Sequence, residues 1–218
     1  MDLGKCLAWG GPAPDLMALR IKSHWFKAGT PKSPQQTASA LAFIVWRVAQ
    51  NMLKQMRTAQ FDIDVGPQYF AFMREVLVFL IAVVDRMAFD RMPEGERTEF
   101  TTALVRRVAE ILEDSENDLL GPPPAGDESH RAQFIELFNV RSDEYAGFGH
   151  GPEGPDFGFV RYLGSCVTAL MVQKDQTWAL DQIMAVEAPE AVTMLQRAMQ
   201  DVFSTEPRPV RQHGLSGD

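Results

Sequence analysis

The stretch VLVFLIAVV, residues 76–84, decides the fold of this chain. Arg74 and Glu75 precede it, and Asp85 and Arg86 follow it. Successive residues of an α-helix are about 100° apart, so nine consecutive apolar residues cover every side of the helix. Such a helix either spans a membrane or is enclosed by other helices. A membrane span requires roughly 20 apolar residues, so the flanking charges favour the enclosed helix.

This central helix is predicted to cover residues 68–92, because Gly66-Pro67 precedes it and Pro93 with Gly95 ends it. Apolar residues at helical spacing elsewhere predict six further helices. These cover about 34–59 and 96–119, and then start near residues 129, 156, 175 and 189. No segment alternates with period two, and no repeat of 20–50 residues is present. The predicted fold class is all-α, with about seven helices in an orthogonal, bundle-like globule around residues 68–92.

The chain divides into three parts. Residues 1–33 are predicted to form a basic, aromatic-containing N-terminal arm, residues 34–204 a single all-α domain, and residues 205–218 a flexible tail. The stretch GPPPAG at 121–126 cannot be helical and is predicted to be a linker within the domain. The central helix has more apolar surface than two neighbours can cover, so helices on both sides of the linker are expected to pack on it.

The net charge of −8 conceals an asymmetry. Residues 1–60 contain eight Lys and Arg and two acidic residues, whereas the rest of the chain contains 13 basic and 27 acidic residues. Opposite charges attract, so the basic segment is expected to pack on the acidic part of its own chain or of a second subunit. An outward-facing patch for an acidic partner is the alternative.

Two distant cysteines, Cys6 and Cys166, argue against a disulfide scaffold. The absence of a recognisable secretory signal favours the cytoplasm.

A polar cluster surrounds the Gly/Pro-rich loop at residues 147–155. If the helices on either side of this loop are antiparallel, their ends bring carboxylates, guanidinium groups, an imidazole and phenols together. We predict that these groups form a ligand-binding pocket. The alternative is an ion-pair network that holds the loop in place, because helix ends attract such side chains without any chemistry. The residues concerned are Arg141, Glu144, Tyr145, His150, Arg161 and Tyr162.

Two other motifs are better explained by structure than by chemistry. GHGPEG at residues 149–154 matches the dinucleotide fingerprint, but no buried strand precedes it and Pro152 lacks one of the amides needed. The chain also lacks the paired Glu-x-x-His motifs of di-metal helical proteins, its nearest match being a single Asp127-x-x-His130. No metal or cofactor is therefore predicted. The charges beside residues 76–84 are expected to find partners on other helices or to reach water.

The segment KSHWFK, residues 22–27, mixes basic and aromatic side chains. We predict that it acts as a clasp on its own chain or on a second subunit. Nucleic acid is not expected as a partner, because most of the chain is acidic and would repel a polyanion. The residues assigned to partner binding are Lys22, Trp25, Phe26 and Lys27.

The sequence contains no complete catalytic motif, and no catalytic residue is assigned. Our leading hypothesis is a soluble, cytoplasmic helical protein that acts by non-covalent interaction, as an assembly factor and a homodimer. The second is a helical protein that binds a small apolar or anionic ligand beside the 141–162 cluster, and the third is an enzyme that uses this cluster as acid and base. The sequence does not specify the partner, the ligand or the pathway.

Overall fold

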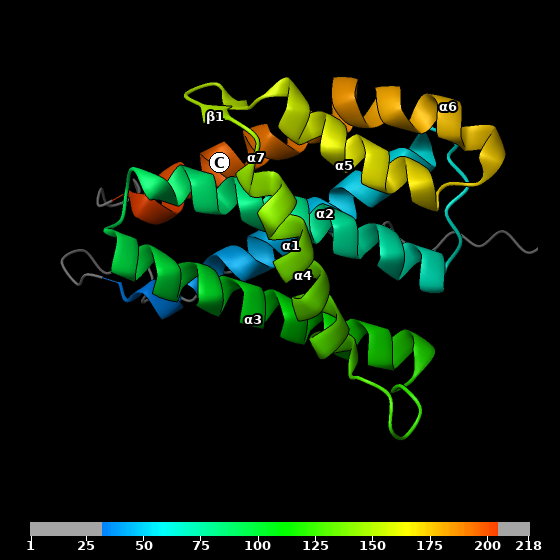
Figure 1. The fold of residues 1–218 in the computed structure, drawn as a ribbon, viewed down its shortest axis with the longest axis horizontal. Helices are drawn as coiled ribbons and strands as arrows, with labels where there is room; N and C mark the ends of the chain where they lie inside the picture. Colours follow the sequence, from blue (N-terminus) through cyan, green and yellow to red (C-terminus); the bar gives the residue numbers. More distant parts are fainter. Residues whose placement is uncertain (1–31, 205–218) are drawn as a thin grey trace, which may run out of the picture. The chain divides into compact units, whose positions relative to one another are not determined.

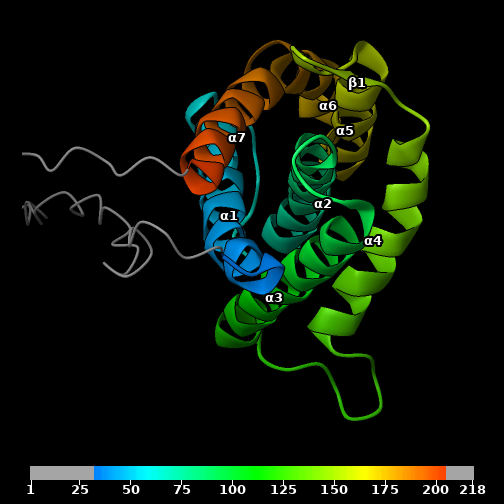
Figure 2. The same ribbon diagram turned by 90° about the vertical axis from the view of Figure 1, so that its left-hand side faces the viewer.

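The structure, a computed structural model, describes residues 32–204. The predicted clasp at residues 22–27 and the predicted tail from 205 lie outside these residues. Helix α2 (Pro67–Phe89) lies in the middle, with the other helices around it (Figures 1 and 2). All of residues 76–84 except Ala82 are buried, and Phe79 and Val83 have no exposed surface. The all-α class and the enclosed central helix are therefore confirmed.

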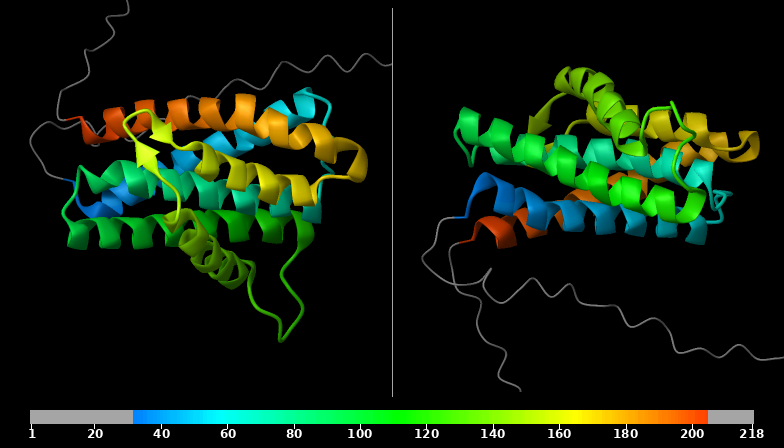
Figure 3. Two further views of the ribbon diagram at one scale, coloured as in Figure 1. Left: turned by 45° about the horizontal axis from the view of Figure 1, so that its top comes forward. Right: turned by 90° about the horizontal axis from the view of Figure 1, so that it is seen from below.

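Helix α1 (Pro34–Thr58) begins where local signals predict it. The Ser33 hydroxyl accepts a hydrogen bond from the Gln36 amide, and the Gln36 side chain accepts one from the Ser33 amide, while Pro34 occupies the first helical position. This capping box satisfies backbone donors that a helix start leaves unpaired. The apolar side of α1 faces α2, α3 and α7. Helices α1 and α3 (Glu94–Leu120) lie side by side along most of their lengths (Figure 3).

A loop at residues 121–129 follows α3 and contains the predicted proline-rich linker. Ser129 then caps helix α4 (His130–Ala146) by accepting a hydrogen bond from the Ala132 amide. Helix α4 packs on the outer side of α2 and α3 (Figure 2). Within α4, only Phe134 and Tyr145 are buried.

A short antiparallel hairpin, β1 (His150–Gly151) and β2 (Gly154–Pro155), connects α4 to helix α5 (Phe157–Leu170). Asp156 caps α5 by accepting a hydrogen bond from the Phe159 amide, and its other carboxylate oxygen accepts one from the Gly149 amide. A helix, not a buried strand, thus precedes the GHGPEG stretch. The hairpin is a connector, as predicted, and lacks the geometry of a dinucleotide site.

Helix α6 (Gln173–Gln182), the π-helical turn η2 (Ile183–Glu187) and helix α7 (Ala188–Phe203) follow one another without a break. Residues 32–204 therefore form six continuous helices, and the prediction of about seven was wrong. Pro189 was expected to start a separate helix. A proline inside an α-helix lacks one hydrogen bond and crowds the preceding turn. The wider π-turn accommodates it, with the Ala188 amide bonded to the Ile183 carbonyl. Helix α6 was predicted to start near residue 175, but it begins at Gln173 with Val172 as its N-cap.

Within residues 32–204, none of the helices combines the length and the apolar composition that crossing a lipid bilayer requires.

Candidate functional site

The charges at both ends of the apolar run of α2 bind groups on other helices, as the sequence analysis expected. Asp85 accepts hydrogen bonds from Arg97 at 2.9 Å and from Thr101 at 2.6 Å, both on α3. Arg86 donates to the carbonyl oxygens of Tyr145 and Ala146, in the last turn of α4, at 3.3 and 3.2 Å. A cation is favourable there because the last carbonyl groups of a helix are unpaired and carry partial negative charge.

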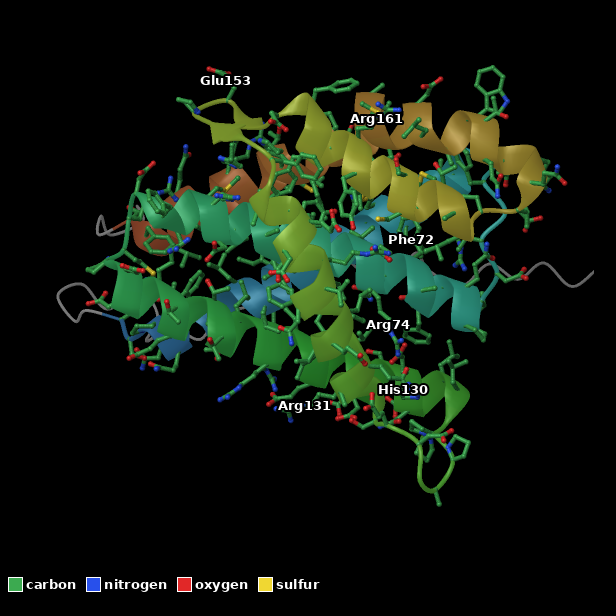
Figure 4. All side chains as sticks on the ribbon, in the orientation of Figure 1. Phe72, Arg74, His130, Arg131, Glu153 and Arg161 are labelled. Carbon is green, nitrogen blue, oxygen red and sulfur yellow. The ribbon has the colours of Figure 1, made fainter. Side chains whose placement is uncertain are left out.

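Arg74 belongs to a buried network at the other end of the apolar run. Its guanidinium group donates to Glu116 of α3 at 2.9 Å and to Gln133 of α4 at 3.2 Å. The Glu116 side chain is 2% exposed, and His130 Nδ1 lies 3.3 Å from the same carboxylate oxygen. The second ring nitrogen of His130 lies 3.2 Å from the Gly121 carbonyl oxygen. Figure 4 shows Arg74 and His130 at this corner of the fold. The network thus ties α2, α3, α4 and the start of the linker together.

Glu75, Arg141, Tyr145, Tyr162 and Cys166 form a second buried group between α2, α4 and α5, called the Glu75 cluster below. Arg141 donates to both oxygens of Glu75, at 2.7 and 3.1 Å. This bidentate geometry is the strongest form of carboxylate–guanidinium pairing. The hydrogen bond to Glu75 raises the pKa of Arg141, so the guanidinium stays charged. A further hydrogen bond runs from Arg141 to the Tyr162 hydroxyl at 3.0 Å.

Tyr145 is the most buried phenol of the cluster, with 2% of its surface exposed. Its ring lies against Phe159 at 4.6 Å, Tyr162 at 5.0 Å and Phe79 at 6.2 Å between ring centroids. Burial raises its pKa well above 10, so the hydroxyl stays protonated at neutral pH. This hydroxyl has no hydrogen-bond partner within residues 32–204. A buried polar atom without a partner is uncommon and costs free energy.

Cys166 lies on α5, with 9% of its surface exposed. Its thiol lies near the Tyr162 hydroxyl and the Glu75 carboxylate. Burial, followed by the negative charge of Glu75, raises its pKa to about 11. Because the thiolate is the nucleophilic form, a thiol with this pKa is a weak nucleophile at neutral pH.

The structure brings together three of the six residues that were predicted to form a pocket, namely Arg141, Tyr145 and Tyr162. Glu144 and Arg161 are exposed, and the half-buried His150 lies in β1, where burial and then the charge of Arg86 lower its pKa below 6.5. Two members of the Glu75 cluster, Glu75 and Cys166, were not among the residues predicted to form a site. Glu75 carried a usable signal as a charge beside an apolar run that needs a partner, whereas Cys166 carried none.

The outer surface bears a groove between α1 and α3 with a volume of about 460 Å³. Gln35 of α1 donates to Glu99 of α3 at 3.3 Å near the start of both helices. Farther along, Arg107 pairs with Glu110 at 2.8 Å and lies 5.2 Å above the ring of Phe43. The groove is therefore lined by polar and charged side chains from both helices.

Large aromatic side chains are exposed at other places on the surface. Trp178 on α6 is 65% exposed, Phe157 at the start of α5 is 70% exposed, and Phe89 at the end of α2 is 62% exposed. Arg97 lies 5.1 Å above the ring of Phe89, but no cation covers Trp178 or Phe157 within residues 32–204. Trp178 is thus the largest uncovered apolar side chain in this part of the protein.

Within residues 32–204, no three side chains of His, Cys, Asp or Glu are grouped so that they could hold a metal ion. Comparison of the chain with protein-family models, with curated proteins and with solved structures finds no match. Function is therefore inferred from the geometry of the residues themselves.

Proposed function

We propose that this protein is an interaction or assembly factor that acts by non-covalent contact with other polypeptides and is itself a homodimer. The observation that carries the proposal is the 65% exposure of Trp178. Tryptophan buries up to about 250 Å² in an interface. Covering the exposed part at about 25 cal/mol per Å² therefore contributes roughly 3–4 kcal/mol. Tryptophan is also enriched among the residues that dominate binding energy at protein interfaces.

The helix that presents Trp178 packs on α5 and makes polar contacts with the loop before α2. Lys174 and Asp175 precede Trp178 by one helical turn and lie on the same side of α6. Lys174 pairs with Asp62 at 2.9 Å, and Asp175 accepts a hydrogen bond at 2.7 Å from the Asp62 amide in the loop before α2. An aromatic side chain on a fixed helix loses little conformational entropy on binding. The charged residues around it resemble the polar rim of a protein interface.

The states of the buried groups favour this proposal over an enzyme. In the Glu75 cluster the carboxylate is neutralised by Arg141, and the pKa of Cys166 is raised to about 11. Tyr145 also has a raised pKa because it is buried. A general acid or base works best with a pKa near the working pH. These groups are better suited to joining α2, α4 and α5 than to proton transfer.

Binding of a small ligand is the second candidate function, and the hydroxyl of Tyr145 favours it. This hydroxyl is buried beside Arg141 and has no partner within residues 32–204. A small polar ligand that accepts a hydrogen bond from it would remove the cost of burying an unpaired donor. A single ordered water molecule would do the same.

Native mass spectrometry of the full chain, purified from its source cells, distinguishes these functions. We expect two copies of the chain together with a polypeptide partner. The Trp178→Ala variant should lose the partner and keep the dimer, whereas Val140→Ala, which changes an exposed apolar side chain on α4, should keep both. A monomer that carries a stoichiometric small molecule would refute the interaction proposal and support the second candidate.

A further inference from the structure

We infer that the groove between α1 and α3 binds a second copy of this chain, with the two α3 helices antiparallel across a twofold axis. This inference rests on the proposed homodimer and identifies its interface. The groove has a volume of about 460 Å³ and is lined by both helices, which lie side by side (Figure 3).

Within residues 32–204, two charged side chains in the groove are not neutralised by an ion pair. Arg107 and Glu110 pair with each other, so neither needs a partner from another chain. Arg106 is exposed and forms no ion pair within residues 32–204. Glu99 is exposed too, and its contact in this part of the chain is with the uncharged amide of Gln35. A carboxylate and a guanidinium group thus remain available on one helix.

The spacing of these two charges makes the surface complementary to itself. Glu99 and Arg106 are seven residues apart, so they lie on the same side of α3, about 10 Å from each other along its axis. Thr102 and Ala103 lie midway between them. If a twofold axis passes through this midpoint, Glu99 of each copy faces Arg106 of the other. One symmetry operation therefore forms two ion pairs, and the small side chains between them let the helices approach to 8–10 Å.

A copy of the same chain fits this pattern better than an unrelated partner. A uniformly basic partner would be attracted by Glu99 and repelled by Arg106, and a uniformly acidic partner would meet the reverse. In the symmetric arrangement each charge meets its opposite. The edge of the groove also offers Phe43, which is 41% exposed beneath Arg107 and could be covered by the second copy.

Charge-reversal variants of the full chain test this inference through the dimer dissociation constant, measured by sedimentation velocity. Glu99→Arg and Arg106→Glu should each raise the constant about tenfold or more, because two attractive pairs become repulsive. The double variant restores opposite charges and should return to within about threefold of the wild type. Matched controls are Glu136→Arg on α4 and Arg197→Glu on α7, both exposed, and neither should change the constant. Far-ultraviolet circular dichroism confirms that each variant is folded.

The possible outcomes separate the interface from the homodimer itself. A wild-type dimer that neither single reversal weakens refutes this interface and leaves the homodimer standing. A monomeric wild type refutes both. A monomer that dimerises only when residues 1–31 are deleted would show that the N-terminal segment of the same chain occupies the groove, which also overturns the inference. Weakening by both single variants without recovery in the double variant would refute direct pairing of the two charges.

Discussion

Replacing Arg141 by methionine tests how strongly the Glu75 cluster holds α4 and α5 to the central helix. The variant keeps an apolar stem of similar length but leaves the Glu75 carboxylate, 9% exposed, without its cation. Removing one partner of a fully buried ion pair costs 3–5 kcal/mol. The Arg141 side chain is 29% exposed, so water partly replaces it and the lower end applies. We expect a loss of about 3 kcal/mol in the free energy of unfolding.

Chemical denaturation and thermal unfolding measure this change. In a domain of this size, 1 kcal/mol corresponds to about 3 °C, so Tm should fall by roughly 8–9 °C. Replacing both partners, as Glu75→Leu with Arg141→Met, removes the buried charge as well and should cost about 1 kcal/mol or less. The double-mutant cycle should therefore give a coupling free energy of at least about 2 kcal/mol.

Arg161→Met is the matched control, because it removes an exposed arginine from α5 and should change stability by less than about 0.5 kcal/mol. An Arg141→Met variant that unfolds within 1 °C of the wild type would refute a buried ion pair of this strength. Simple addition of the effects of the two single substitutions would also refute it, since additivity would mean that the carboxylate and the guanidinium do not act as a pair.

The shifted pKa values of Glu187, His150 and Cys166 determine how stability and thiol reactivity depend on pH. Burial raises the pKa of Glu187 above 4.5 in the folded protein. The protonated carboxyl therefore contributes stability below pH 4.5, and this contribution is lost as the pH rises through the pKa of Glu187 in the folded protein. The free energy of unfolding of Glu187→Gln, measured by chemical denaturation, should therefore equal that of the wild type near pH 4 and be larger near pH 7. Burial and Arg86 lower the pKa of His150, so the stability present above pH 6.5 is lost as the pH falls through the folded-state value. The His150→Gln variant should not show this loss of stability at low pH. In the wild type, a nuclear magnetic resonance titration should give a pKa below 6.5 for His150. Because its pKa is about 11, Cys166 carries little thiolate at pH 8 in the folded protein. In a Cys6→Ser background, a disulfide reagent should therefore modify Cys166 roughly 100-fold more slowly in the folded protein than in urea.

The central helix could be predicted because its sequence permits one environment. Nine apolar residues leave α2 no side that water can face, and the charges beside them exclude a membrane span. The start of α1 was equally predictable, since Ser33, Pro34 and Gln36 act through contacts within four residues. The joined α6 and α7 were not predictable in the same way. Pro189 is a strong local signal for a helix start, and only the π-turn before it lets the helix continue.

The Glu75 cluster shows why the candidate site was predicted only in part. Arg141 and Tyr162 lie near the ends of two consecutive helices, so their proximity followed from the expected antiparallel packing. The pair between Arg141 and Glu75 joins residues 66 positions apart. No local pattern specifies such a contact, although the unpaired charge beside an apolar run shows that some partner is needed. The burial of Cys166 and Tyr145 depends on the same tertiary contacts.

Helix α4 is held on α2 and α3 by few buried apolar side chains and by several polar contacts. Of its 17 residues, only Phe134 and Tyr145 are buried. Burying two large side chains contributes only a few kcal/mol, and Tyr145 also places an unpaired hydroxyl in the interior. The apolar contacts of α4 are therefore modest, since Ile135, Leu137 and Phe138 are only half-buried.

Three charged side chains of α2 make directional contacts that fix the position of α4 along the central helix. Arg74 binds α4 in its first turn through Gln133, Glu75 binds Arg141 farther along, and Arg86 binds the carbonyl oxygens of the last turn. Buried ion pairs often add little net stability, but shifting α4 by one turn would leave the Glu75 carboxylate buried without a cation. That cost of several kcal/mol applies to the shifted arrangements and not to the native one. The same charges that limit the apolar run in the sequence therefore also fix the register of the helix that packs across it.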